Sequence, residues 1–164
     1  MSRVDPDFEL FFKQMYPRAA GVAFRLTLDR PTAEDVASEA FARALARWGR
    51  VGRMSYRDAW VLRVASNLAL DIVRRKPPRI EVTEVAPDVS DQATLSMALS
   101  NALAALPRRQ RQTIVLRFLA GMTESEAAAV LGTAPGTVGV QTRRGLAALR
   151  RELGTDEEAD IGWI

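Results

Sequence analysis

The spacing of apolar residues constrains this chain more than any other feature. Apolar side chains recur three and four positions apart along nearly all of its 164 residues. This spacing places them on one side of an α-helix and leaves the polar residues on the other side. No segment of the sequence shows the sustained alternation of apolar and polar residues that indicates a half-buried β-strand. The sequence therefore predicts an all-α fold.

The N-terminal part contains signals for the ends of the first helices. Asp5-Pro6 predicts a helix start, with Asp5 as the N-cap and proline in the first turn. Pro17 is expected to break or bend this helix, because proline lacks the backbone N–H that an interior position donates. A second helical stretch is expected to reach about Leu28.

A strongly amphipathic segment follows from Thr32 to Trp48. Its apolar positions predict one buried face, made of Ala33, Val36, Ala37, Ala40, Phe41, Ala44, Leu45 and Trp48. Its polar positions predict one solvated face, made of Glu34, Asp35, Ser38, Glu39 and Arg43.

After a loop expected at Gly49 to Ser55, a further helix is predicted to reach about Arg75. Ser55 with Asp58 three residues later resembles a capping box at its start. Its buried stripe is predicted to comprise Val61, Val64, Ala65, Leu68 and Ile72. Another side carries Trp60, Arg63, Asn67 and Arg74.

That second side combines an aromatic ring with guanidinium and amide groups. Aromatic rings stack on unstacked bases of any sequence, and an amide can read the edge of a base. The alternatives are that Trp60 is a core residue and that Arg74 and Arg75 form a cationic helix end, which the helix dipole favours.

Charge divides the chain into four segments. Residues 1–76 carry 14 basic and 9 acidic residues, and residues 96–154 carry 8 and 3. Residues 77–95 carry 1 and 4, and residues 155–164 carry 0 and 4. Two basic blocks indicate two modules that each face a polyanion, although arginine-rich surfaces also keep small domains in solution.

The boundary between the modules follows from the same segments. Pro77-Pro78 is expected to end the preceding helix, and residues 77–95 lack a core-forming period. We therefore expect domains at 1–76 and 96–154, a flexible acidic linker at 77–95 and an acidic tail at 155–164.

The composition argues against most enzyme classes. The chain has no cysteine and no histidine, which excludes disulfides, thiolate metal sites and imidazole bases. Lys13 and Lys76 stand beside no obvious nucleophile, and no glycine-rich phosphate loop is present. We expect no catalytic residue, no metal and no cofactor.

The sequence shows neither a signal peptide nor a membrane-spanning run, so a cytoplasmic location without membrane insertion is expected.

The last module has the pattern of a helix-turn-helix. Thr123 and Glu126 form a capping box before a short apolar helix, Gly132 follows as the turn, and Pro135 opens a second helix. On this helix the inward positions are Val138, Leu146, Leu149 and Leu153, and the outward positions are Gln141, Arg143, Arg144, Arg150 and Arg151. Such a face can enter the major groove of DNA, whereas an ordinary helical hairpin with a solvated arginine face is the alternative.

The two modules resemble one known family, the extracytoplasmic-function (ECF) sigma factors of bacterial RNA polymerase. The N-terminal part is similar to the family's region 2, from FELFFKQMYPRAAGVAFRLTLDRPTAEDVASEAFARALARW to AWVLRVASNLALDIVRR. The C-terminal part is similar to region 4, over ALAALPRRQRQTIVLRFLAGMTESEAAAVLGTAPGTVGVQTRRGLAALRREL. The resemblance covers nearly the whole chain except the linker and the tail. It implies a region 2 helical bundle joined to a region 4 helix-turn-helix.

The resemblance also implies roles for particular residues. Candidate contacts to the clamp helices of the polymerase largest subunit are Asp35, Ser38, Glu39 and Arg43. Candidate contacts to the melted −10 element are Trp60, Arg63, Asn67, Arg74 and Arg75. Candidate contacts to the −35 duplex are Thr137, Gln141, Arg143 and Arg144, with arginine suited to guanine or phosphate and glutamine to adenine.

Some positions depart from the family pattern. Ser38 stands where the family commonly has glutamine. Gly139 and Val140 stand where a basic and a small polar residue are frequent, which removes one expected phosphate contact and lowers helix propensity. Ala134 occupies the expected N-cap position, where serine is common, and Thr133 is the nearest residue that can substitute.

Core RNA polymerase and promoter DNA are the partners that the resemblance implies, and an anti-sigma factor is a further candidate because many members of the family are held inactive by one. Two other hypotheses stay open. One is a helix-turn-helix regulator that binds duplex DNA without polymerase. The other is an adaptor that binds polymerase and has lost promoter recognition.

Overall fold

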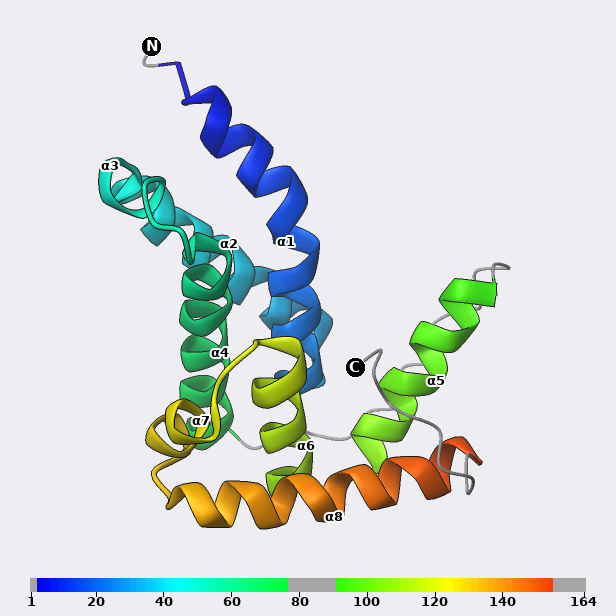
Figure 1. Cartoon of the computed structure of the whole chain (residues 1–164). Coiled ribbons are helices and arrows are strands. Elements are labelled where there is room, and N and C mark those ends of the chain that lie inside the picture. Colours follow the sequence, from blue (N-terminus) through cyan, green and yellow to red (C-terminus); the bar gives the residue numbers. More distant parts are fainter. Residues whose placement is uncertain (1–2, 77–90, 155–164) are drawn as a thin grey trace. The chain divides into compact units, whose positions relative to one another are not determined.

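A computed structural model describes residues 3–76 and 91–154, with residues 91–95 described by their backbone alone. The chain divides into two compact units, Met1–Pro78 (unit 1) and Arg79–Ile164 (unit 2). Every element in the described ranges is a helix, which confirms the all-α expectation (Figure 1). Most of the predicted linker and the whole acidic tail lie outside the described residues.

Unit 1 is a bundle of three long helices and one short one. It contains α1 (Pro6–Thr27), α2 (Arg30–Ala46), α3 (Trp48–Val51) and α4 (Arg57–Arg75), and α1, α2 and α4 all pack against one another. The short α3 begins at Trp48, which was predicted to end the preceding helix, and covers the start of the segment that was predicted to be a loop. The largest fully buried side chains of this bundle are Phe11, Leu26, Leu70, Val51, Val61 and Val73.

Pro17 was expected to break or bend the first helix, and of these two outcomes the break is wrong, because α1 continues through Pro17 to Thr27. Asp5 caps the helix as expected, since its side chain accepts a hydrogen bond from the Asp7 backbone N–H at 2.9 Å. Buried residues lie on both sides of Pro17, from Phe11 to Leu26. Burying one continuous stripe offsets the hydrogen bond that proline cannot make.

Helix α2 begins at Arg30, two residues before the predicted start, because Asp29 is its N-cap. The Asp29 carboxylate accepts hydrogen bonds from the Thr32 backbone N–H at 3.0 Å and from the Thr32 hydroxyl. The predicted buried face is confirmed from Ala33 to Ala44. Leu45 is an exception, because it is 45% exposed and lies just beyond the edge of the buried stripe near the end of the helix.

Helix α4 begins at Arg57, and the predicted Ser55 capping box does not form. Tyr56 is the N-cap residue and makes no side-chain capping hydrogen bond. The buried face is rotated by about one residue from the predicted stripe. It comprises Val61, Leu62, Ala65, Ser66, Ala69, Leu70 and Val73.

Helix α4 packs against both α1 and α2. Close packing against two helices favours small side chains, so the buried face includes Ala65, Ser66 and Ala69. The buried Ser66 hydroxyl keeps a hydrogen-bond partner, because it donates to the Leu62 carbonyl oxygen at 2.7 Å. Ile72, which was predicted to be buried, is 37% exposed.

Unit 2 is built around its last helix. It contains α5 (Asp91–Ala105), α6 (Arg108–Ile114), the π-helical turn η1 (Val115–Leu119), α7 (Glu124–Leu131) and α8 (Pro135–Leu153), and α5, α6 and α7 all contact α8. Helix α5 begins at Asp91, inside the segment 77–95 that was expected to be a flexible linker. The core cluster consists of Ala102, Leu103, Leu106, Ile114 and Leu149. Within residues 3–76 and 91–154, no helix is both long and apolar enough to span a bilayer.

Candidate nucleic-acid interface

The turn between α7 and α8 is fixed by backbone signals that are visible in the sequence. The Thr123 hydroxyl accepts from the Glu126 N–H at 3.1 Å, and the Glu126 carboxylate accepts from the Thr123 N–H at 2.8 Å. This confirms the predicted capping box. Gly132 ends α7 with φ 67°, in the left-handed region that glycine adopts without strain. The next helix therefore leaves in a new direction.

Helix α8 presents the predicted −35 candidates on its outer side. Thr137, Arg143 and Arg144 are exposed, and Gln141 is half-buried. Arg150 and Arg151 are exposed further along the helix. Val138 and Leu149 are buried as predicted, and Leu146 and Leu153 are half-buried. Ala134 is the N-cap residue and makes no side-chain capping hydrogen bond, so Thr133 does not substitute as a cap.

Two glycines of α8 lie against neighbouring helices. A Cβ at Gly145 would stand 2.5 Å from Cδ1 of Ile114, so any larger residue there requires the Ile114 side chain or the two helices to shift. A Cβ at Gly139 would stand 3.4 Å from Glu124 Oε1, at ordinary contact distance. Gly139 is buried, and the Glu124 carboxylate is the group nearest to the position that a side chain would take.

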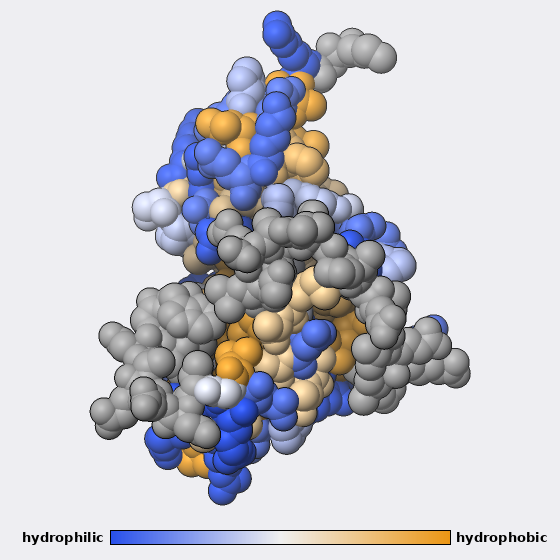
Figure 2. Space-filling model, turned by 90° about the vertical axis from the view of Figure 1, so that its right-hand side faces the viewer, coloured by the Kyte–Doolittle hydropathy of each residue, from blue (hydrophilic) through white to orange (hydrophobic). Residues whose placement is uncertain are grey.

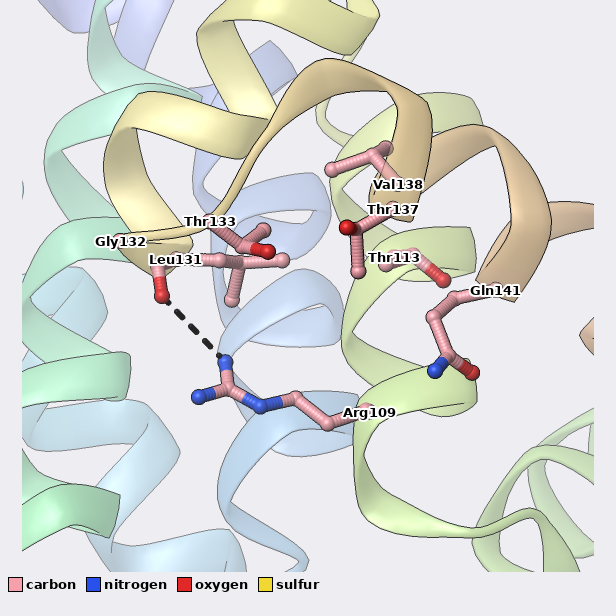
Figure 3. Close-up of a pocket in the computed structure, with 8 residues that line it drawn as sticks. All are labelled: Arg109, Thr113, Leu131, Gly132, Thr133, Thr137, Val138 and Gln141. Atoms are coloured by element: carbon pink, nitrogen blue, oxygen red, sulfur yellow. Dashed lines mark hydrogen bonds between the residues drawn. The ribbon is translucent and has the colours of Figure 1, made fainter.

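A cavity of about 170 Å³ lies beside the start of α8, and the sequence did not predict it. It is lined mainly by Arg109, Thr113, Thr133, Thr137 and Gln141 (Figure 3). The Arg109 guanidinium reaches from α6 and donates to the Leu131 carbonyl oxygen at the end of α7, at 3.5 Å. A cation at a helix C-terminus is favoured by the dipole. The sequence signal that could have indicated this contact is the basic pair Arg108-Arg109 after Pro107.

Helix α6 buries three polar residues, Arg111, Gln112 and Thr113. Arg111 is almost fully buried, and burial lowers the pKa of its guanidinium, with a further lowering by the positive charge of Arg108. The arginine-rich start of α6 is therefore only partly a solvated surface.

On α4 the predicted −10 candidates share one side of the helix. Trp60 and Arg63 are half-buried, and Asn67 is exposed. Arg74 and Arg75 are exposed at the C-terminal end, where Arg74 pairs with Asp71 at 3.3 Å. Tyr56, four residues before Trp60, is 56% exposed and extends this side by one turn. Its i, i+4 spacing to Trp60 was the signal that could have identified it.

On α2 the four predicted polymerase-binding residues are all exposed on one face. Glu39 and Arg43 pair with each other at 2.9 Å. The Tyr16 hydroxyl lies 3.4 Å from the Ser38 hydroxyl, so α1 contributes to the same surface. Apolar side chains are also exposed on α1, and Figure 2 shows apolar beside hydrophilic surface near the N-terminal end of unit 1. Among the described residues, no group of three or more acidic side chains could hold a metal ion.

Comparisons with known proteins match both halves of the chain. Residues 11–77 match the family Sigma-70 region 2, and residues 96–149 match Sigma-70, region 4. The RNA polymerase sigma-E factor of Streptomyces avermitilis is 33% identical over 90% of this chain and 85% of its own length. The chain belongs to the ECF sigma factors.

Further relatives and solved structures agree with this assignment. The ECF RNA polymerase sigma factor SigW of Bacillus subtilis is 30% identical over 80% of this sigma factor and 81% of its own length. CnrH, solved with the cytosolic domain of CnrY, matches with a TM-score of 0.57 at 26% identity, covering 92% of this chain and 89% of its own. RpoE of Bartonella quintana, solved with the anti-sigma factor NepR, shares the fold, with a TM-score of 0.69 at 23% identity, covering 93% of this chain and 100% of its own. This sigma factor directs promoter-specific transcription initiation.

Proposed function

We propose that the two units divide promoter recognition between them. Unit 1 binds core RNA polymerase through the α2 face and holds the opened −10 element on the α4 side that carries Trp60 and Asn67. Unit 2 places α8 in the major groove of the −35 element. The proposal is carried by the outer face of α8, where exposed Arg143 and Arg144 lie near the half-buried Gln141. This face follows a capped and glycine-terminated α7, in a chain whose other unit presents Trp60 and Asn67.

The chemistry of each surface supports this division. Arginine and glutamine on α8 match guanine, adenine and phosphate acceptors in a major groove. Tyr56 and Trp60 offer ring faces to unstacked bases, and Asn67 offers an amide to a base edge. Contacts to captured bases and phosphates offset an unstacking cost of a few kcal/mol per step, so opening requires no catalytic residue.

The proposed partners are bacterial core RNA polymerase and promoter DNA, which places the protein in the bacterial cytoplasm. An anti-sigma factor is a further proposed partner. Such a partner would cover the same α2 and α8 surfaces and so prevent both contacts at once.

Promoter-dependent run-off transcription with bacterial core polymerase on genomic fragments tests this proposal. Wild type is expected to initiate at discrete sites. Asp35→Arg is expected to lose core binding, because it reverses the charge of an exposed residue on the α2 face. Asn67→Ala is expected to bind core and fail to open promoters. Arg18→Gln, which changes an exposed arginine of α1 outside both surfaces, serves as the control.

Two results would support the alternatives. Tight binding of duplex DNA without any association with core would indicate the helix-turn-helix regulator. Binding to core without initiation at any fragment would indicate the adaptor.

A further inference from the structure

The Arg57 side chain joins parts of unit 1 that are distant in the sequence. Its Nη1 donates to Asp7 Oδ2 at 2.8 Å, and its Nη2 donates to Asp7 Oδ1 at 3.4 Å. Nη1 also donates to the Gly52 carbonyl oxygen at 3.2 Å. One guanidinium thus connects the first turn of α1 with the turn at residues 52–56, between α3 and α4.

Two aromatic rings hold the same guanidinium in place. Its Cζ lies 5.4 Å from the ring centroid of Phe11 and 5.6 Å from that of Trp48. The Arg57 side chain is 30% exposed. An exposed ion pair alone contributes little, but a forked carboxylate contact, a carbonyl acceptor and two rings together restrict the group to one position.

Local helix rules do not account for an arginine at this position. Arg57 is the first residue of α4, where the helix dipole disfavours a cation, and the Tyr56 N-cap makes no side-chain hydrogen bond. The turn is also tightly packed at its other end, since a Cβ at Gly52 would stand 2.9 Å from Cε2 of Trp48. The long-range contacts of Arg57 therefore determine where this turn lies.

The 52–56 turn leads directly into the proposed −10 surface. Arg53 and Tyr56 are exposed on it, and Trp60 and Asn67 follow on α4 one and three turns further along. We propose that Arg57 is a positioning residue that, with Asp7, fixes the 52–56 turn and so sets which base unit 1 accepts from the opened −10 strand. This inference rests on the proposed function of α4.

Holoenzyme assembled from this sigma factor and core polymerase tests it with a randomised single-stranded DNA pool. The bound fraction is sequenced, and the enrichment of each base gives a preference profile. Arg57→Gln is expected to reduce the strongest base preference by about tenfold, while its affinity for core changes by less than about twofold. Arg57→Lys is expected not to restore the preference, because an ammonium cannot make the forked contact.

A double variant connects the effect to the Asp7 pair. Asp7→Asn alone is expected to weaken the preference, and adding it to Arg57→Gln is expected to cause no further loss. Arg18→Gln is the charge-matched control and should keep the wild-type profile. The profile is a ratio between bases, so partial unfolding of a variant lowers total binding without changing it.

The outcomes separate this inference from the function on which it rests. If Arg57→Gln keeps the wild-type profile while Asn67→Ala flattens it, the positioning role of Arg57 is wrong and the −10 role of α4 stands. If both variants keep the profile, the proposed −10 surface is itself wrong. A flattened profile in both variants, with core binding retained, supports both.

Discussion

Gly145 shows how one missing side chain lets two helices approach each other. An added Cβ would stand 2.5 Å from Cδ1 and 3.2 Å from Cγ1 of Ile114, a fully buried residue of the unit 2 core. Because Ile114 is buried in the core cluster and must shift to admit a Cβ, Gly145→Ala should lower the free energy of unfolding by about 1–3 kcal/mol despite the better helix propensity of alanine. Urea denaturation followed by circular dichroism measures this change.

Gly136 provides the matched control for that substitution. It lies in the same helix with no atom within 4 Å of its Cβ position, so Gly136→Ala should leave stability unchanged or raise it slightly. Removing Cδ1 with Ile114→Val in the Gly145→Ala background should recover part of the loss. If Gly145→Ala proves as harmless as Gly136→Ala, the close contact between α6 and α8 is not present in solution.

Gly139 is expected to limit how tightly α8 holds DNA. A Cβ there meets only flexible side-chain ends, with Glu124 Oε1 at 3.4 Å and Arg143 Nη1 at 3.8 Å. Gly139 is buried with the Glu124 carboxylate as its nearest neighbour, so the ammonium of Gly139→Lys must extend past Glu124 to add one phosphate contact. That contact should tighten holoenzyme binding to −35 duplex DNA by about three- to tenfold at low salt and steepen its salt dependence by about one counterion. Fluorescence anisotropy over a salt series measures both quantities.

The control here is Gly139→Ala, which gains the helix propensity without the charge. It should leave the salt dependence unchanged. Equal effects of lysine and alanine would mean that helix stability, rather than a missing phosphate contact, sets the affinity.

At the scale of whole elements, the capping box of α7 determines where the helix-turn-helix begins. Thr123→Ala removes the acceptor for the Glu126 N–H and should lower the free energy of unfolding of unit 2 by about 1 kcal/mol. Ser125→Ala changes an exposed hydroxyl two residues later and should alter stability by less than about 0.5 kcal/mol. Chemical denaturation of the two variants side by side gives the comparison, and equal losses would show that the cap contributes nothing.

Several element ends could be predicted from local signals in the sequence, although the predicted Ser55 capping box does not form. Asp5, the Thr123 capping box and Gly132 act through bonds to residues nearby in the chain, and all three were predicted correctly. The continuation of α1 through Pro17 and the rotation of the buried face of α4 were not predicted, because each depends on what the helix packs against. Burial along α1 overrides the proline, and contact with two helices selects the small residues of α4.

The candidate surfaces divide in the same way. The exposed faces of α2 and α8 follow from helical spacing within a single element, so the sequence alone defined them. Arg57 and Asp7 are 50 residues apart, and Arg109 reaches Leu131 across 22 residues. No local pattern links such pairs, and only the packing of the helices reveals them.

At the scale of the molecule, each unit has its own buried core, and the last prediction concerns their independence. Two of the three tryptophans, Trp48 and Trp60, belong to unit 1, and the third is Trp163. In a Trp163→Phe background, tryptophan fluorescence therefore reports on unit 1, whereas circular dichroism reports on both units. Gly145→Ala should shift part of the circular dichroism transition to lower temperature, by roughly 4–8 °C per kcal/mol, and leave the fluorescence transition unchanged. A fluorescence transition that moves by the same amount would show that the two cores unfold as one cooperative unit, because destabilising α8 could reach Trp48 and Trp60 only through that coupling.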